Sequence, residues 1–258
     1  MSLAQQLLLR ALIVWFWEKP YQAKLIPWGT ALHDRFMLGY FVWQDFLTVI
    51  DDLKRADLPV SADWFVPHRD FRFPGCGIVE HAGLSLEIGQ ALEPWNVLGE
   101  EGVIGGTARY VDSSVERLEV RVTGLTDDRY TVSCNGYEVP LTRTGVTGQR
   151  IGAVRFKAWS PPSSLHPSIP VQAPLTFDIV DTRLGRSIGG CRYHVTHPGG
   201  RGLELFPINA YEAEGRRLAR FETMGHSPGA INLKRFGVHP DFPLTLDLRR
   251  AAAAHIRG

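Results

Sequence analysis

The feature that most constrains the fold of this chain is a change in its hydrophobic period near residue 70. Before that point, apolar residues recur every three or four positions, which predicts helices. The clearest example is the series Phe36, Tyr40, Trp43, Leu47 and Ile50. After that point, apolar and polar residues alternate, which predicts strands with one buried and one solvated face. Because parallel strands are usually buried on both faces, the alternation favours an antiparallel sheet.

The segment 1–68 is therefore predicted to be helical. Ser2 is a suitable N-cap for a first helix that ends near Trp17. This helix is apolar nearly all round, so we expect it to be buried on several sides. A second helix is expected over 32–56, and Ser61 is expected to cap a short helical turn.

Residues 69–206 are predicted to form an antiparallel β-sandwich or distorted barrel of about eight short strands. Hairpin turns are expected at Asn135-Gly136 and Leu184-Gly185, which separate alternating runs. The remaining segment, 207–258, is expected to hold a helix capped by Asn209 and an irregular tail that ends in a weak Ala-rich helix. The predicted fold class is thus α+β, with N-terminal helices, a mostly antiparallel sandwich or barrel, and a C-terminal helix and tail.

Several charged residues alternate with apolar ones inside these strands. We expect their side chains to lie on the solvated faces of the sheet, because the apolar residues between them form the buried face. The residues concerned are Arg117, Glu119, Arg121, Arg155 and Lys157.

Composition excludes several classes of protein. The 258 residues carry a formal net charge of +1, which gives no electrostatic reason to expect nucleic acid as a partner. Cys76, Cys134 and Cys191 are odd in number and widely spaced, which argues against a disulfide framework or a structural zinc site. The apolar run 7–17 is far shorter than the roughly 20 residues that span a bilayer. The first residues also lack the pattern of a signal peptide, so we expect a cytoplasmic protein with no membrane partner.

The first group of candidate ligand-binding residues is His33-Asp34-Arg35, at the start of the expected second helix. A buried structural network and contact with a ligand remain equally open for these residues. Glu93 and Trp95 form a second candidate pair, although charges near a loop are usually solvated and no positioned nucleophile accompanies them. No catalytic residue is therefore assigned.

The third candidate region is the glycine-rich stretch that contains His197 and Arg201. His194 and His197 resemble a metal pair, but residues three apart on a strand point to opposite faces, which argues against a shared ion. The glycines leave a strand with no helix nearby, so turn geometry is favoured over a phosphate cradle. We therefore predict no metal site.

The distribution of tryptophan is also informative. Five of the seven tryptophans lie in the first 64 residues. Two helices cannot bury this much aromatic surface by themselves, so they are expected to dock on the β domain, on a second copy of the chain or on another segment.

Several long stretches resemble the C-terminal region of a bacterial family that joins a transglutaminase-like domain to an amidoligase region, formerly a domain of unknown function. These stretches include SLAQQLLLRALI, WGTALHDRFML, QALEPWNVLGEEG, YHVTHPGG and FPINAYEAEGRRLARF. The similarity extends over essentially the whole chain. The resemblance implies that the residues for ATP, Mg²⁺ and substrate carboxylate lie upstream, so no cofactor is expected in this chain. Gly89 stands where family members tend to have Arg, which argues against a role for Glu87 in an E-x-R motif.

Three functional hypotheses follow. The first is a non-catalytic C-terminal part of an ATP-dependent amidoligase, whose partners are the upstream domains and, as an open alternative, a second copy. The second is a carbohydrate- or peptide-binding sandwich in which Trp95 and Trp159 line a groove. The third is a hydrolase or isomerase that uses His33, Glu93 or His197. Whether this chain is itself an enzyme is left open.

Overall fold

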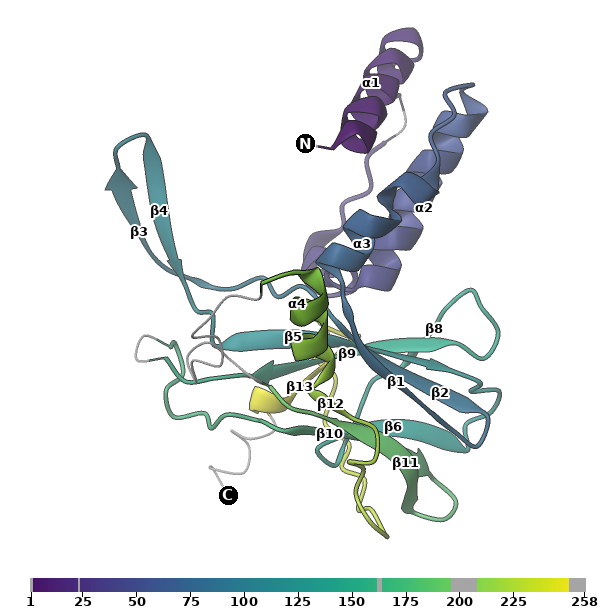
Figure 1. Cartoon of the computed structure of the whole chain (residues 1–258), viewed down its shortest axis with the longest axis vertical. Coiled ribbons are helices and arrows are strands. Elements are labelled where there is room, and N and C mark those ends of the chain that lie inside the picture. Colours follow the sequence, from purple (N-terminus) through teal and green to yellow (C-terminus); the bar gives the residue numbers. More distant parts are fainter. Residues whose placement is uncertain (1, 23, 162–163, 196–207, 251–258) are drawn as a thin grey trace.

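The computed structural model describes residues 2–22, 24–161, 164–195 and 208–250. A group of helices rises from one side of a two-layered β structure, and a β-hairpin projects separately (Figure 1). The predicted α+β class is confirmed, and the strands form two open sheets in place of a closed barrel. In the described ranges, no helix is long and apolar enough to cross a membrane.

The helical part contains three α-helices and three short 3₁₀ helices. They are α1 (Leu3–Glu18), η1 (Gly29–His33), η2 (Arg35–Met37), α2 (Gly39–Arg55), η3 (Ala62–Phe65) and α3 (Val66–Arg72). The predicted caps at Ser2 and Ser61 are confirmed, since each hydroxyl oxygen accepts a hydrogen bond from a backbone N–H in the first turn.

Two local predictions in this part are wrong. The helix expected from Leu32 begins only at Gly39, because Leu38 is extended and Asp34 breaks the preceding 3₁₀ turns. The β region predicted from residue 69 begins later, since α3 continues to Arg72 and the first strand starts at Gly75. Pro67 favours that helix, because proline is well accommodated in a first turn.

Two sheets pack face to face. The larger has the order β1-β2-β5-β9-β13 with β8 also paired to β9, and the smaller has the order β12-β11-β10-β6-β7. All pairings are antiparallel except β13 with β9. The strands of the larger sheet are β1 (Gly75–His81), β2 (Leu84–Gln90), β5 (Val115–Thr123), β8 (Thr142–Arg143), β9 (Arg150–Lys157) and β13 (Thr245–Asp247). Those of the smaller sheet are β6 (Tyr130–Cys134), β7 (Tyr137–Glu138), β10 (Leu175–Asp181), β11 (Arg186–Tyr193) and β12 (Phe221–Glu222).

The main core lies between these two sheets. It is built from the apolar residues of the alternating strands, such as Leu118, Val154 and Phe177, and all three cysteines are buried in it as free thiols. The hairpin predicted at Asn135-Gly136 joins β6 to β7. Both turn residues have positive φ, 48° and 81°, as a type I′ turn requires.

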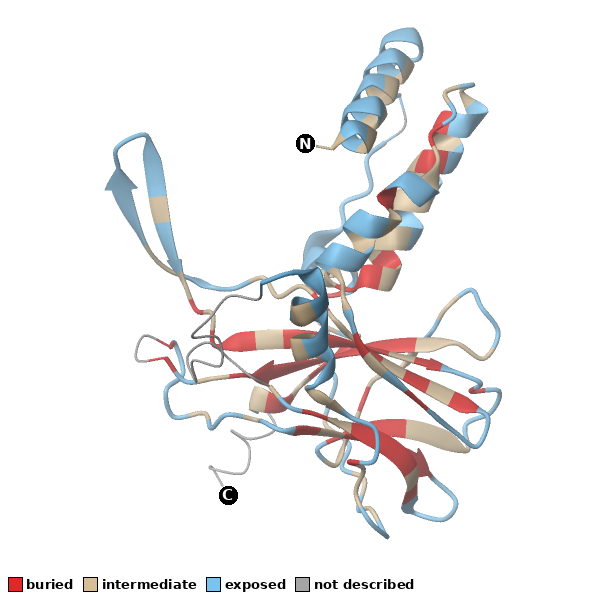
Figure 2. Ribbon diagram, in the orientation of Figure 1, coloured by how far each residue is buried: buried red, intermediate tan, exposed pale blue. Residues whose placement is uncertain are grey.

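The outer face of the larger sheet differs from the prediction, because it is largely covered. Leu38 and Phe41 of the helical part pack on Ile151 and Ala153 of β9. Arg117, Glu119 and Arg155 are buried on this face, although alternation alone placed them in solvent. Lys157 is also buried, and its contacts are with the loop that contains His166 and Gln172. Burial is nearly continuous along β9, where residues 151–157 are all buried, and Figure 2 shows that buried residues are concentrated in the two sheets.

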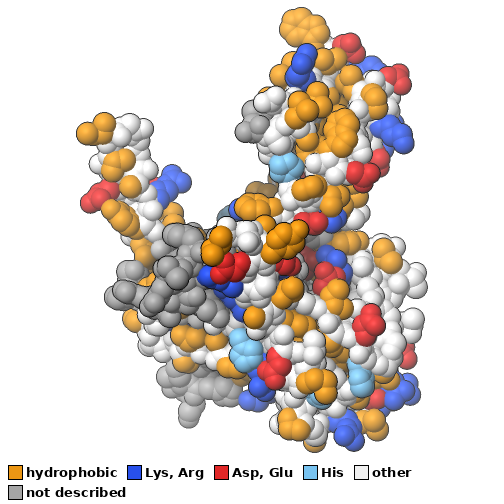
Figure 3. Space-filling view, viewed as in Figure 1, with side chains coloured by type: hydrophobic (Ala, Val, Ile, Leu, Met, Phe, Trp, Pro, Cys, Tyr) orange, Lys and Arg blue, Asp and Glu red, His pale blue; other side chains and the backbone are white. Residues whose placement is uncertain are grey.

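Helix α1 also departs from the prediction, in the opposite sense. None of its residues is buried, although one side packs on α2 through Leu8, Leu12 and Trp15. The other side is open to solvent, and Trp17 is 86% exposed. Figure 3 shows apolar side chains gathered on the helical part. The expectation of burial on several sides is therefore wrong within this chain.

Three further features complete the fold. The strands β3 (Val97–Val103) and β4 (Gly106–Val111) form a hairpin that was not predicted, and within the described part of the chain they make a separate two-stranded sheet. Helix α4 (Ala210–Leu218) begins at Asn209 as predicted, with Glu212 N–H bonded to the Asn209 side chain. The tail is not entirely irregular, because β13 joins the larger sheet. Most of the expected Ala-rich helix falls in 251–258, outside the described residues.

Candidate functional site

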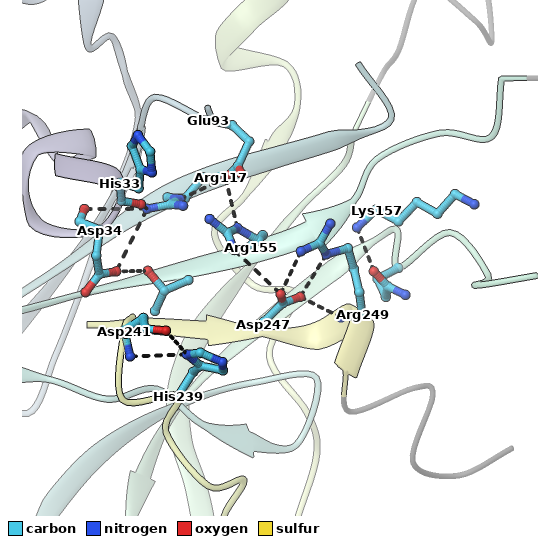
Figure 4. Close-up of polar contacts among 12 residues, drawn as sticks. His33, Asp34, Glu93, Arg117, Arg155, Lys157, His239, Asp241, Asp247 and Arg249 are labelled. Atoms are coloured by element: carbon cyan, nitrogen blue, oxygen red, sulfur yellow. Dashed lines mark hydrogen bonds and ion pairs between the residues drawn. The ribbon is translucent and has the colours of Figure 1, made fainter. Parts of the chain in front are cut away.

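The candidate site lies on the covered outer face of the larger sheet. Charged residues from five separate segments meet there, between η1, the loop after β2, β5, β9 and β13 (Figure 4). We call this group the arginine–carboxylate cluster; its members are Asp34, Glu93, Arg117, Arg155, Asp247 and Arg249.

Arg117 lies at the centre of the cluster and is completely buried. Its Nε donates a hydrogen bond to Glu93 Oε2 at 2.9 Å, and its Nη1 donates to the His33 carbonyl at 3.0 Å. Its Nη2 has no hydrogen-bond partner among the described residues. Burial lowers the pKa of Arg117, and the Glu93 carboxylate opposes that shift. Because an arginine pKa starts far above neutrality, the guanidinium stays charged.

Glu93 bridges two arginines. Arg117 and Arg155 face each other directly across β5 and β9, a position at which like charges destabilise a sheet. Glu93 Oε2 accepts a second hydrogen bond, from Arg155 Nε, at 3.1 Å. The carboxylate therefore neutralises a repulsion that the strand register imposes.

Asp247 and Arg249 extend the cluster along β13. Arg249 donates from Nε and Nη2 to the two Asp247 oxygens at 2.9 and 2.7 Å, a bidentate pair, and Arg155 Nη1 lies 3.8 Å from the same carboxylate. Burial alone would raise the pKa of Asp247, but the Arg249 hydrogen bonds and both positive charges hold it below its usual value. Asp247 is thus ionised at neutral pH.

Asp34 ties the helical part to the tail. Its carboxylate accepts hydrogen bonds from Leu244 N–H, at 2.9 Å, and from the Thr245 hydroxyl. The side chain is buried and is already fully engaged with the chain. Of the two readings left open for His33-Asp34-Arg35, Asp34 matches the structural network.

A cavity of about 360 Å³ opens beside the cluster. Three of the predicted site residues, His33, Glu93 and Trp95, line it together. Trp95 is 46% exposed and its indole N–H donates to the Val115 carbonyl at 2.7 Å. The remaining lining residues are Pro94, Asn96, Val97, Asp112, Val115, Arg155, Phe242 and Arg249.

The other predicted site residues lie elsewhere. Arg35 stacks on the Phe41 ring, with its guanidinium carbon 4.4 Å from the ring centre, and does not line this cavity. His197 and Arg201 fall outside the described residues. Among the residues that are described, no group of three or more His, Cys, Asp and Glu side chains could hold a metal ion.

A second, larger cavity of about 900 Å³ lies between α2, α3, α4 and the β1–β2–β5 part of the same sheet face. Its floor carries Arg121, which pairs with Glu87 at 3.1 Å and Glu119 at 2.7 Å. Tyr40 and Trp43 form part of its helical wall. Most of its charges are paired, but Arg121 Nε and Arg217 Nη1 have no hydrogen-bond partner among the described residues.

Comparison with known proteins identifies the family. The sequence model of the family described as Putative amidoligase enzyme (DUF2126) matches residues 1–249. The chain belongs to this amidoligase family. The match includes the helical part, both sheets and the cluster through Arg249. No curated protein and no solved structure matches the chain.

In this amidoligase family member, sequence reasoning missed Arg117, Arg155, Asp247 and Arg249 as site residues. Arg117 and Arg155 were assigned to solvent because alternation does not show what covers a sheet face, and Asp247 and Arg249 lay in the segment predicted as an irregular tail. The two strand arginines could have been found from the strand register. Antiparallel pairing of 115–122 with 150–157 places Arg117 opposite Arg155, and two like charges in that position need a carboxylate between them. The cluster is suited to binding a charged ligand by hydrogen bonds and electrostatic attraction, because hydrogen bonds hold its guanidinium and carboxylate groups in place.

Proposed function

We propose that this chain is the non-catalytic C-terminal part of a cytoplasmic, ATP-dependent amidoligase that is fused to a transglutaminase-like domain. In this proposal ATP and Mg²⁺ bind upstream residues, and the helical part of this chain docks on that upstream ligase-like region. The β-sandwich then serves assembly or substrate presentation. Self-association of the chain is the alternative use of the same surface.

The observation that carries the proposal is the open apolar side of α1. Ile13 is exposed, Trp17 is almost fully exposed, and the segment that follows adds exposed Leu25 and Ile26. Contiguous apolar surface of this kind usually marks an interface, because leaving it in water is unfavourable. Membership of an amidoligase family supports a ligase region as the occupant.

The test is direct binding between this chain and the upstream ligase-like region of the same protein, measured by biolayer interferometry. We expect a 1:1 complex that Ile13→Ser and Trp17→Ser each weaken by about ten-fold, since each removes a large side chain from the interface. The matched control is Ile104→Ser, which changes an equally apolar, exposed residue at the tip of the β3–β4 hairpin. No complex, or equal binding by all three variants, would contradict the docking.

The non-catalytic assignment has its own test. Isothermal titration of this chain alone with Mg-ATP is expected to show no binding. Stoichiometric binding would count decisively against the proposal, whatever the outcome of the docking assay.

A ligand-binding module is the second candidate function, and the position of Trp95 favours it. Its half-exposed ring lines a cavity together with charged groups, as in many small-molecule sites. Trp159 does not line that cavity: its indole N–H donates to the Ser113 carbonyl, and its ring packs against the sandwich core. A groove with both rings as its walls is therefore not formed.

A further inference from the structure

We infer that the cavity beside the arginine–carboxylate cluster is a binding site for a small monocarboxylate with an apolar or aromatic body. This inference concerns a ligand site within this chain and does not depend on the docking of α1.

The first support is a surplus of hydrogen-bond donors at the cavity. The hydrogen bond from Arg155 to Glu93 uses only Nε, which leaves Nη1 and Nη2 without a hydrogen bond among the described residues. Arg249 uses Nε and Nη2 for Asp247, and its Nη1 has no hydrogen bond to any residue that the structure describes. Both arginines line the cavity. The unpartnered Nη2 of Arg117, deeper in the same cluster, shows that the carboxylates present do not satisfy all the guanidinium groups.

The second support is the shape of the free groups. Guanidinium N–H groups match the planar, two-oxygen geometry of a carboxylate, and such charge-assisted hydrogen bonds are stronger than neutral ones. The pair of Arg249 with Asp247 is already of this two-oxygen type, whereas Glu93 accepts one hydrogen bond from each of its two arginines. A carboxylate ligand would therefore repeat, with the free Nη atoms, the arrangement that Asp247 makes with Arg249.

The third support concerns charge. Glu93 and Asp112 also line the cavity. Burial alone would raise the pKa of Asp112, but hydrogen bonds from Ser114 and Leu165 and the charge of Lys157 hold it below its usual value. A negative charge on Asp112 repels a doubly charged phosphate more than a singly charged ligand. The local charge thus favours a monoanion.

The fourth support is the apolar part of the lining. Trp95 and Phe242 provide rings, and Pro94, Val97 and Val115 provide aliphatic surface. A volume of about 360 Å³ is at the lower end of the range for small-molecule sites. An amphipathic acid of about ten non-hydrogen atoms would place its body on these residues and its carboxylate at the arginines.

The probe is 3-phenylpropionate, titrated into ¹⁵N-labelled protein. The readout is the Trp95 indole N–H signal in NMR spectra, assigned by its loss in Trp95→Phe. We expect a saturable shift with a dissociation constant of about 1 mM or below. The neutral isostere 3-phenylpropionamide and inorganic phosphate are expected to give no saturable shift.

The variant Arg249→Lys keeps the charge but loses the planar fork, and we expect it to weaken binding about ten-fold. Arg249→Gln should abolish binding, and Arg109→Gln, in the projecting hairpin, is the control that should leave it unchanged. Spectral dispersion of the other indole signals shows whether each variant is folded. The inference is overturned by the absence of saturation with 3-phenylpropionate, by equal binding of the amide, by preferential binding of phosphate, or by unchanged affinity in folded Arg249→Lys.

Discussion

Replacing Glu93 by Gln should destabilise the protein strongly, because it removes the carboxylate that bridges Arg117 and Arg155. Glu93 Oε2 accepts hydrogen bonds from both guanidinium groups, at 2.9 and 3.1 Å, and all three side chains are at least nine-tenths buried. Removing one partner of a buried ion pair costs about 3–5 kcal/mol. A glutamine oxygen still accepts one hydrogen bond, which puts the expected loss in the free energy of unfolding at about 3 kcal/mol.

Urea denaturation at pH 7, followed by circular dichroism, measures this loss. The matched control is Glu100→Gln, which breaks the exposed pair of Glu100 with Arg109 on the hairpin and should cost less than about 1 kcal/mol. The double variant Glu93→Gln with Arg155→Met should be less destabilised than the sum of the two single variants, since it removes the repulsion as well. If Glu93→Gln costs no more than Glu100→Gln, the bridging role assigned to Glu93 is wrong.

Three other predictions follow from the same structure. The folded-state pKa of Asp247 is lowered, so its contribution to stability is present above about pH 4 and is lost as pH falls through that pKa; Asp247→Asn should flatten this acid dependence in urea titrations. Burial raises the pKa of Cys76 to about 11 and that of Cys191 to about 12. A thiol reagent at pH 8 should therefore react with these cysteines at a measurable rate only when urea unfolds the protein. Fast reaction of the folded protein would contradict their burial. Gly190→Ala should lower the free energy of unfolding by at least about 2 kcal/mol. The reason is that φ is 148° there and a Cβ atom would lie 2.0 Å from the Phe177 carbonyl oxygen. An unchanged free energy of unfolding in the same assay would show that the strand can shift to make room for the methyl group.

The alternating periods predicted much of the fold, because period two depends only on local side-chain geometry. The sandwich core, the turn at Asn135-Gly136 and the caps at Ser2 and Asn209 all follow from such local rules. The start of α2 could not be predicted from local rules, since Asp34 accepts a hydrogen bond from the distant Thr245 instead of capping a nearby helix. A contact over that separation leaves no local pattern in the sequence.

The candidate site was predictable only in part, for the same reason. His33, Glu93 and Trp95 were selected by residue type, and the structure places them around one cavity. Arg155 and Arg249 complete that cavity, but one looked solvated and the other lay in a segment that reads as irregular. Their positions depend on the parallel pairing of β13 with β9. Neither hydrophobic alternation nor a turn motif in the sequence predicts this pairing.

The bonds from Asp34 to Leu244 and Thr245 join parts of the chain that are 210 and 211 residues apart. During synthesis the helical part leaves the ribosome before the sheets of this chain, yet the strand that anchors it is among the last described residues to be made. Long-range contacts of this kind form slowly, because the loop between the two ends must close first. The apolar surface of α1 is therefore exposed to solvent before the sandwich is complete. A nascent chain has a long interval in which a chaperone, or the ligase region that we propose as its partner, can bind this surface.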